Sequence, residues 1–379
     1  MKNKKNLGLY LHIPFCERKC LYCDFLSAAA DTNTKNSYVD ALIKEIASYK
    51  EWGRDYFVQT MFIGGGTPTS LDKESIARIM DEVRNTFCIN DEAEITIEMN
   101  PGTIDREKLL AIKQSGINRI SMGLQSADNK ELKLLGRIHT YETFLENYSL
   151  ARELGFDNIN IDLMSALPGQ NLQKWMETLE KVTELKPEHI SAYSLILEEG
   201  TPFYHKYSSI PSDEELDRQM YWETEKYLEN KGYLHYEISN YAKETKECRH
   251  NNSYWVRENY LGLGLGASSM IENTRFRKED DLKEYIKNAG NHILTDKETE
   301  KLTINQQMEE FMFLGLRLME GISKADFEIK FHIPIESIYK EVIERSIKEQ
   351  LLQEKENRLY LTDRGIDLSN TVMARFLID

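Results

Sequence analysis

Residues 1–240 alternate short apolar runs with longer amphipathic segments, and this alternation constrains the fold more than any other feature of the sequence. Short apolar runs are typical of buried strands, and apolar residues at helical spacing are typical of helices. Six strand–helix units in a row predict an α/β fold with a parallel sheet and right-handed crossovers. Because a closed barrel of this kind has eight units, the number predicts a partial (β/α)6 barrel. The predicted strands are 7–13, 57–63, 95–99, 119–124, 158–163 and 189–197. The predicted helices are 38–49, 75–87, 106–114, 128–135, 141–154, 172–185 and 214–229.

The regular alternation ends near residue 240. Residues 233–238 predict an added strand, and 300–319 predict a long amphipathic helix that is followed by shorter helical patterns and a strand-like segment at 358–362. We therefore predict a smaller helix-rich C-terminal domain of winged-helix type. The predicted division is a partial barrel at 1–240, a connecting region at 241–299 and the C-terminal domain at 300–379.

The charge of the chain limits the partners that it can bind. Its 379 residues include 48 Lys and Arg against 63 Asp and Glu, which gives a net charge of −15. A negative protein repels nucleic-acid phosphates and anionic lipid unless a local basic patch intervenes, and the sequence contains no such patch. No stretch is apolar enough to span a membrane, and the basic N-terminus leads into no signal-peptide core. We therefore expect a cytoplasmic protein with reduced cysteines, no transmembrane segment and no nucleic-acid partner.

Three of the five cysteines lie in one short segment after the first predicted strand: Cys16, Cys20 and Cys23, at C-x3-C-x2-C spacing. Closely spaced thiolates are typical ligands of iron–sulfur clusters, and a 4Fe-4S cluster held by three cysteines leaves one iron open. A zinc site is an alternative that would need a fourth ligand, for which His12 is the nearest candidate. Disulfides fit poorly because the number of cysteines is odd and no secretory signal precedes them.

A glycine-rich turn, Gly64-Gly65-Gly66-Thr67-Pro68-Thr69, follows the second predicted strand. Glycines let a ligand approach the backbone closely and expose amide donors. The turn is not a phosphate-binding loop, because the Gly-Lys-Ser/Thr ending is absent and Pro68 has no amide hydrogen. By itself the turn can equally be a simple connector.

Polar side chains stand at or near the ends of later strands. Glu98 ends the third strand, Gln125 follows the fourth, and Arg137 follows a helix. Asp162 lies inside the otherwise apolar fifth strand, where a carboxylate is costly without a partner. Each residue alone can be part of a capped turn or a surface ion pair. Together, at one barrel mouth, they predict a binding site that Tyr10 of the first strand also lines.

With Tyr22 in the last cysteine spacer, the cysteine motif resembles that of the radical S-adenosylmethionine (SAM) family. The resemblance implies an open six-stranded barrel, a 4Fe-4S cluster on the three cysteines and SAM chelated at the open iron. In that family an electron passed to the sulfonium releases a deoxyadenosyl radical, while the protein supplies a dry, oriented site. The residues that the resemblance assigns to SAM are Tyr10, Gly65, Gly66, Thr67, Glu98, Gln125, Arg137 and Asp162.

Within this family the chain most resembles the oxygen-independent coproporphyrinogen dehydrogenases and their relatives, the HemW-type haem chaperones. The dehydrogenases carry a fourth cysteine where this chain has Phe25, and an N-terminal extension that we expect to be absent here. The chaperones carry a His-Asn-x-x-Tyr-Trp motif, found here at residues 250–255. The resemblance therefore implies a haem chaperone that delivers haem to an acceptor protein, which can be membrane-associated. The alternative is a radical SAM oxidoreductase that acts on coproporphyrinogen III or another tetrapyrrole. A tRNA-modifying enzyme fits the negative charge least.

The motif makes His250 the predicted axial haem ligand, because imidazole is a common ligand of haem iron. Tyr254 and Trp255 can pack against the macrocycle. An ordinary hydrogen-bonded histidine is the alternative, and Cys248, two residues away, is a candidate second ligand.

Two further local patterns receive no functional assignment. Residues 262–267 match a loose G-x-G-x-x-A dinucleotide pattern, which we discount because it follows no clear strand and opens no clear helix. Ala166 stands where relatives commonly carry glycine, and the sequence does not indicate what this change alters.

Overall fold

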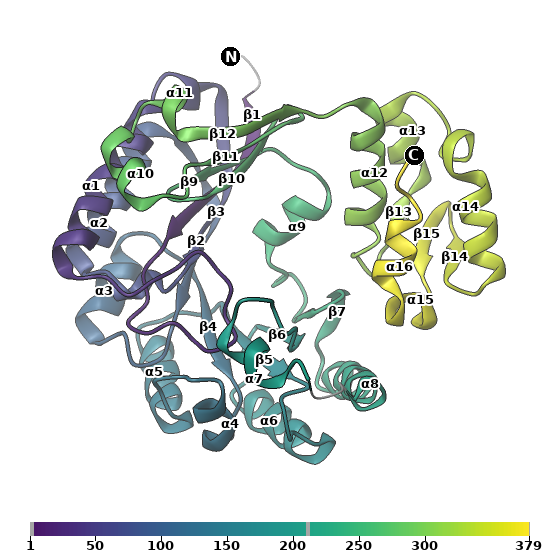
Figure 1. The fold of residues 1–379 in the computed structure, drawn as a ribbon, viewed down its shortest axis with the longest axis horizontal. Coiled ribbons are helices and arrows are strands. Elements are labelled where there is room, and N and C mark those ends of the chain that lie inside the picture. Colours follow the sequence, from purple (N-terminus) through teal and green to yellow (C-terminus); the bar gives the residue numbers. More distant parts are fainter. Residues whose placement is uncertain (1–3, 210–212, 379) are drawn as a thin grey trace.

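The computed structural model describes residues 4–209 and 213–378. Most of this chain forms one 12-stranded sheet with its helices, and a smaller C-terminal unit lies beside it (Figure 1). The strands of the large sheet are β1 Lys5–Ile13, β2 Tyr56–Gly65, β3 Cys88–Met99, β4 Arg119–Gln125, β5 Ile159–Ser165, β6 His189–Ser194, β7 Leu234–Glu237, β8 Asn240–Ala242, β9 Tyr260–Leu263, β10 Ser268–Ile271, β11 Thr274–Lys278 and β12 Asp296–Lys301. The accompanying helices are α1 Thr32–Ser48, α2 Lys73–Thr86, α3 Arg106–Gln114, α4 Asn129–Leu134, α5 Tyr141–Glu153, α6 Leu172–Glu184, α7 Pro202–Tyr207, α8 Glu214–Asn230, α9 Arg249–Trp255, α10 Leu282–Asn288 and α11 His292–Thr295.

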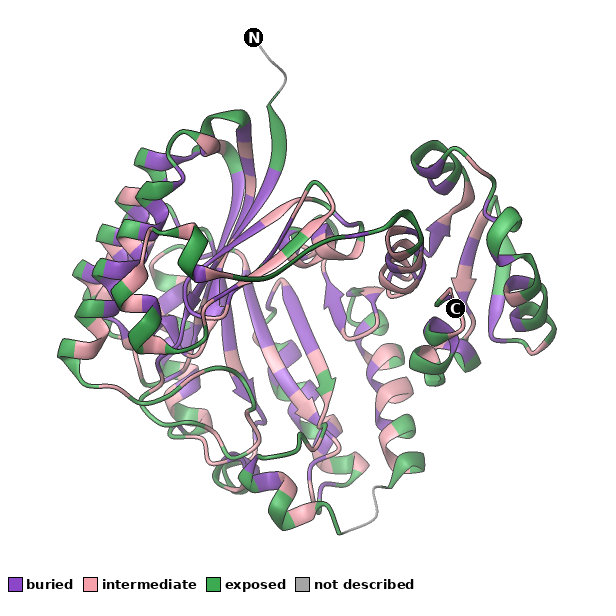
Figure 2. Cartoon of the chain, turned by 45° about the horizontal axis from the view of Figure 1, so that its top comes forward, coloured by how far each residue is buried: buried purple, intermediate pink, exposed green. Residues whose placement is uncertain are grey.

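Strands β1 to β6 are parallel and lie side by side in chain order. The sheet ends at β12 on one side and at β7 on the other, so it does not close. This confirms the predicted partial six-stranded barrel. The central strands are buried along most of their length, while the helices around them expose their outer sides to solvent (Figure 2). Such continuous burial explains why these strands appear in the sequence as unbroken apolar runs.

The helices of the barrel begin where short polar residues cap them. Each capping side chain accepts a hydrogen bond from a backbone amide of the first turn, which satisfies a donor that the helix itself leaves free. The caps of α1 to α6 are Asp31, Asp72, Asp105, Asp128, Thr140 and Asn171.

Additional strands extend both edges of the parallel core. Next to β6, β8 and β7 pair in antiparallel fashion, and β7 is the predicted added strand at 233–238. At the other edge β9 pairs in parallel with β1, and β10 to β12 continue the sheet in antiparallel fashion. The predicted connecting region at 241–299 therefore contributes most of these strands to the same sheet as the barrel.

The C-terminal unit has a hydrophobic core of its own, which runs from Met308 to Phe376 in the sequence. Its three short strands form a separate antiparallel sheet in the order β13-β15-β14. The unit is helix-rich, as predicted, while its winged-helix type and a domain boundary near residue 300 stay predictions. Its elements are α12 Ile304–Gly315, β13 Ile322–Ser323, α13 Lys324–Phe331, α14 Glu336–Lys348, β14 Leu352–Lys355, β15 Arg358–Leu361, α15 Asp363–Asp367 and α16 Ser369–Ala374.

Glu310 of α12 connects this unit to the large sheet. Its carboxylate accepts from Arg257 Nε at 2.8 Å and from Arg275 Nη2 at 2.7 Å. Glu310 is 4% exposed and Arg257 is 6% exposed, whereas the Arg275 side chain is 44% exposed. A second connection is made by the backbone, because Met319 N donates to Tyr236 O at 3.0 Å.

Two sequence predictions in this part of the chain are wrong. The helix predicted at 300–319 begins only at Ile304, because Thr303 and Gln306 form a capping box and the preceding residues belong to β12. The charged β12 lies at the sheet edge, where lysine and glutamate are common. Residues 262–267 begin inside β9, so the expectation that no strand precedes them is wrong, whereas they open no helix, as expected, and lead by a turn to β10.

Candidate functional site

The loop after β1 brings the three motif cysteines to the carboxyl ends of the parallel strands. It is closed by Cys16 N, which donates to Ala28 O at 3.1 Å. The middle of the loop is held by two further backbone bonds, from Leu21 N to Leu135 O at 3.1 Å and from Phe203 N to Leu21 O at 3.0 Å. The end of α4 and the start of α7 therefore hold the middle of the loop in place.

All three motif cysteines are free thiols of intermediate burial, and two of them receive a polar contact. Thr67 Oγ1 donates toward Cys16 Sγ at 3.5 Å, and Arg137 Nη1 donates toward Cys20 Sγ at 3.4 Å. Burial raises the pKa of the Cys23 thiol above its ordinary value. A hydroxyl and a guanidinium beside sulfur stabilise thiolates, which are the form that binds iron. The donor set therefore fits an iron–sulfur cluster.

His12 does not offer a free nitrogen as a fourth ligand for zinc. Its Nε2 lies 2.9 Å from Leu26 O, and its Nδ1 lies 3.0 Å from the Tyr10 hydroxyl. Burial also lowers the pKa of His12, so the ring is neutral and uses one nitrogen as donor and the other as acceptor. Across residues 4–209 and 213–378, no three His, Cys, Asp or Glu side chains are grouped to hold a single metal ion.

The predicted glycine-rich turn begins with Gly64 and Gly65, the last two residues of β2, and packs against the end of β1. A Cβ atom on Gly65, whose φ is +111°, would lie 2.5 Å from the His12 ring, and one on Gly66 would lie 2.7 Å from Phe15 O. Gly66 N donates to Ile13 O at 2.9 Å. Both glycines are thus required by contacts within the protein itself, and the Gly65 amide is used by Glu98 Oε2 at 3.0 Å.

The two predicted acidic residues lie in the barrel interior. Burial, and next the nearby Asp162, raise the pKa of Glu98 to about 8. Burial also raises the pKa of Asp162, while hydrogen bonds from Asn160 Nδ2 at 2.8 Å and Ser121 Oγ at 3.0 Å act in the opposite direction. A buried carboxylate needs hydrogen-bond partners, and for Asp162 these are the neutral side chains of Asn160 and Ser121.

Arg137 contacts the cluster loop through Cys20, and Gln125 lies at the carboxyl end of β4. Gln125 ends β4 with a φ of +74° and is 8% exposed. Arg137 donates to Asn100 Oδ1 and to the Gly123 carbonyl as well as to Cys20. The guanidinium is thus engaged with the protein, and its buried Nε has no partner among the described residues.

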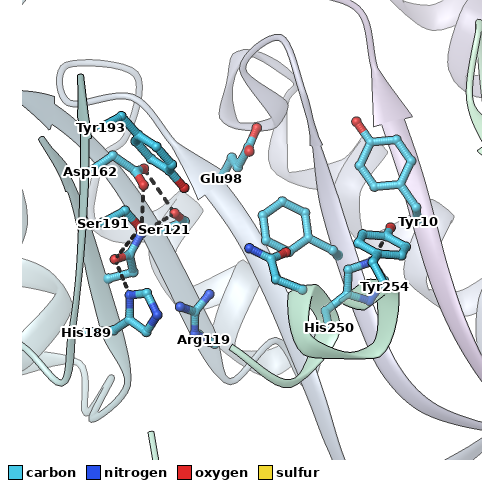
Figure 3. A pocket seen from close by; sticks show the side chains of 13 residues that line it. Tyr10, Glu98, Arg119, Ser121, Asp162, His189, Ser191, Tyr193, His250 and Tyr254 are labelled. Carbon is cyan, nitrogen blue, oxygen red and sulfur yellow. Dashed lines mark hydrogen bonds between the residues drawn. The ribbon is translucent and has the colours of Figure 1, made fainter. Parts of the chain in front are cut away.

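A polar cavity of about 200 Å³ occupies the inner face of the barrel (Figure 3). Of the predicted site residues, Tyr10, Glu98, Asp162 and His250 line it, whereas the glycine-rich turn, Gln125 and Arg137 do not. Besides Asn251 of α9, sequence reasoning missed the other polar residues that the strands contribute to this cavity. They lie at alternate positions of β4 to β6, and period-2 polarity within otherwise apolar strands is the signal that could have identified them. They are Arg119, Ser121, Asn160, His189, Ser191 and Tyr193.

His250 lies on α9, which packs against the inner face of the sheet. Glu94 of β3 fixes the start of this helix by accepting from the backbone N of Arg249 at 3.2 Å and of His250 at 3.1 Å. Both ring nitrogens of His250 have partners, Thr60 Oγ1 at 2.9 Å and Tyr254 OH at 2.7 Å. Burial lowers the pKa of His250 to about 3, so the ring is neutral.

Cys248 does not line this cavity. It is 1% exposed, and its thiol lies 3.7 Å from Glu94 Oε1, to which it donates. Burial raises the pKa of this thiol to about 12. Cys248 therefore stays protonated and helps to hold the start of α9. Cys88, the residue directly after the helix predicted at 75–87, is the exposed first residue of β3.

A second cavity of about 480 Å³ lies between the barrel edge and the C-terminal unit. Tyr254 and Trp255 form part of its wall, together with Met270 of β10 and Leu314 of α12. Tyr10 and Tyr254 line both cavities, so the two spaces share a wall. Aromatic and aliphatic side chains dominate this cavity, which suits a large apolar ligand.

Comparison with known proteins agrees with this geometry. The sequence model of the radical SAM superfamily matches residues 10–182, and that of the HemN C-terminal domain matches residues 302–368. The solved structure of coproporphyrinogen III oxidase (HemN) from Escherichia coli is similar, with a TM-score of 0.88 and 26% identity over 99% of this chain and 90% of that one.

Curated proteins named "Heme chaperone HemW" are similar over nearly the whole chain. The protein of Lactococcus lactis is 36% identical and covers 100% of this chain and 99% of its own. The protein of Bacillus subtilis is also 36% identical, with 97% and 98% covered, and that of Escherichia coli is 32% identical, with 98% of each chain covered. No helix among the described residues has the length and apolarity to cross a membrane. This full-length similarity, on a radical SAM barrel with three free motif cysteines, shows that the chain belongs to the HemW family of radical SAM proteins.

Proposed function

We propose that this protein is a haem chaperone that binds haem and passes it to an acceptor protein, and that its barrel holds a 4Fe-4S cluster and SAM. The observation that carries the proposal is the apolar cavity of about 480 Å³, whose wall includes Tyr254 and Trp255 of the His250 motif. Sites for organic ligands usually occupy about 300–1,000 Å³ and are mostly apolar. Similarity to curated relatives named as haem chaperones supports the same function.

We assign the cluster to Cys16, Cys20 and Cys23. When bound, the cluster supplies one-electron chemistry. The protein's part is to hold the thiols in a fixed loop, with Thr67 and Arg137 donating toward two of them. Hydrogen bonds and positive charge beside the sulfurs favour the deprotonated state that iron binding requires.

We assign SAM to the barrel mouth. Asp162 offers acceptors for hydroxyl or ammonium groups, and Gln125 offers both a donor and an acceptor. Glu98, with its raised pKa, can also donate at neutral pH. The full set that we propose is Tyr10, Gly65, Gly66, Thr67, Glu98, Gln125, Arg137 and Asp162. SAM should change the electron spin resonance spectrum of the reduced cluster, and an unchanged spectrum would remove SAM from the proposal.

We propose His250 as the haem ligand. His250 lines the polar cavity and not the apolar one, so ligation through Nε2 requires this nitrogen to give up its hydrogen bond with Tyr254, whose side chain lines both cavities. Titration of cluster-loaded protein with haem tests this assignment. His250→Ala should weaken haem binding and remove the imidazole contribution to the Soret band, while the cluster stays intact. The exposed His205→Ala serves as the control. Unaltered affinity and spectrum in His250→Ala would exclude this ligand.

A radical SAM oxidoreductase acting on coproporphyrinogen III or another tetrapyrrole is the second candidate. The structural likeness to the E. coli oxidase favours it. Against it stands Phe25, which is 62% exposed at the position where the resembling dehydrogenases carry a further cysteine. The chaperone proposal predicts no conversion of coproporphyrinogen to protoporphyrinogen under anaerobic, reducing conditions. Robust turnover in that assay would make the oxidoreductase the better function.

The partner of the chaperone is, in this proposal, a haem-acceptor protein in the cytoplasm or at the membrane surface. The net charge of −15 supports a protein partner over a nucleic acid.

A further inference from the structure

Arg119 is the only Arg or Lys among the described residues that line the barrel cavity. It is the first residue of β4, it is 1% exposed, and its Nε has no hydrogen-bond partner among the described residues. Its Nη1 makes only a long contact of 3.5 Å to Thr96 Oγ1. A guanidinium stays charged at all ordinary pH values, and a buried charge is costly unless it is paired.

The carboxylates of Glu94 and Asp162 favour the charged form of Arg119 through space, but no carboxylate among the described residues forms a hydrogen bond or close ion pair with it. Asp162 accepts from Ser121 and Asn160, and Glu98 accepts from the Gly65 amide. Neither carboxylate forms an ion pair with Arg119 in the part of the chain that the structure describes. The guanidinium therefore faces the cavity as a positive group whose donors are largely unused (Figure 3).

The histidines beside Arg119 do not compete for an anion. His189 Nδ1 lies 2.6 Å from Asn160 Oδ1, and its Nε2 lies 2.8 Å from Tyr236 OH. Burial, and next the charge of Arg119, lower the pKa values of both His189 and His250. Both rings are neutral and have their nitrogens occupied, so Arg119 supplies the positively charged donors of the cavity, beside the neutral amide of Asn251.

We propose that the floor of the barrel cavity is a carboxylate-binding subsite and that Arg119 binds the carboxylate there. The planar guanidinium matches the two oxygens of a carboxylate, and such charge-assisted pairs are strong. A cavity of about 200 Å³ is smaller than most sites for whole organic ligands, so it takes a short carboxylate arm or a small monocarboxylate of propionate size. If the arm belongs to haem, the inference rests on the proposed function, since haem carries two propionates.

Sodium propionate is the first probe, used with the full chain in ligand-observed nuclear magnetic resonance. Wild-type protein should bind propionate saturably and should not bind propionamide, which has the same shape without the charge. Arg119→Gln should weaken propionate binding by about tenfold or more, whereas the exposed Arg106→Gln should not change it. Arg119→Lys keeps the positive charge but not the planar guanidinium. Its affinity for propionate should therefore lie between that of wild type and that of Arg119→Gln. If the Gln variant does not fold, as judged by circular dichroism, the comparison of propionate with propionamide on wild type still decides the question.

Haem and haem dimethyl ester then distinguish the source of the carboxylate. Weaker binding of haem, but not of the ester, to Arg119→Gln would assign the subsite to a haem propionate. An effect on propionate alone would assign it to a free monocarboxylate. Absence of haem binding to wild type would overturn the proposed chaperone function while the propionate result still stands. Equal wild-type binding of propionate and propionamide, or no saturable binding of propionate, would overturn the subsite.

Discussion

Replacing Glu310 by Gln should loosen the C-terminal unit from the large sheet. The change keeps the size of the side chain but leaves Arg257 and Arg275 without their shared carboxylate. Arg275 is half-exposed and can turn to water, so the main penalty comes from Arg257, which is 6% exposed. Removing one partner of a buried ion pair typically costs about 3–5 kcal/mol. At about 2 °C per kcal/mol for a large chain, the midpoint of thermal unfolding should fall by about 6–10 °C.

Two controls separate this effect from a general loss of charge. Glu344→Gln removes a carboxylate whose side chain is 67% exposed and which lies 3.9 Å from Lys340, and it should change stability by less than about 0.5 kcal/mol. The double change Arg257→Met with Glu310→Met replaces the buried pair by apolar groups and should recover most of the lost stability. Circular dichroism during heating measures all three variants. A Glu310→Gln midpoint equal to that of Glu344→Gln would refute the reasoning.

Three further predictions concern the barrel. Alanine at Cys16, Cys20 or Cys23 should abolish the broad visible absorption of anaerobically reconstituted protein, and full iron content in the triple variant would contradict the cluster assignment. The pKa of Glu98 is raised to about 8 in the folded state, so its contribution to stability is complete below about pH 4.5 and is lost as the pH rises through 8. In denaturant titrations across that pH range, the free energy of unfolding should therefore fall more for wild type than for Glu98→Gln. An equal dependence on pH in the two proteins would contradict the raised pKa of Glu98. Ala166 has a φ of +57°, where a Cβ atom costs about 1–2 kcal/mol. Ala166→Gly should therefore stabilise the protein by about 0.5–1 kcal/mol in the same titrations, and a loss of stability would show that the methyl group packs usefully.

The sequence predicts the parallel half of the sheet well because local signals and tertiary burial agree there. The predicted helix at 106–114 matches α3 at both ends, since Asp105 is a visible cap. The charged strand β12 was not predicted, because its pairing with β11 depends on contacts formed only in the folded sheet. Strand propensity by itself is a weak guide at such an edge.

Part of the site could be predicted from the sequence alone. Glu98 and Asp162 stand out because an acid in an apolar strand needs an explanation, and both line the barrel cavity. Arg119 and His189 begin their strands and therefore resemble ordinary polar residues at strand ends. The full engagement of both nitrogens of His250 depends on Thr60, which is 190 residues away in the chain. No sequence spacing reveals such a contact.

The wall that Tyr10 and Tyr254 form between the two cavities has a thermodynamic consequence. Tyr254 also bonds His250 at 2.7 Å, so a ligand that moves this phenol on one side alters the hydrogen bonding on the other. Coupling between two binding sites is reciprocal, and each ligand must change the affinity of the other by the same factor. Binding in the apolar cavity and binding in the polar cavity are therefore coupled. Measuring the affinity of either ligand with and without the other gives the coupling free energy.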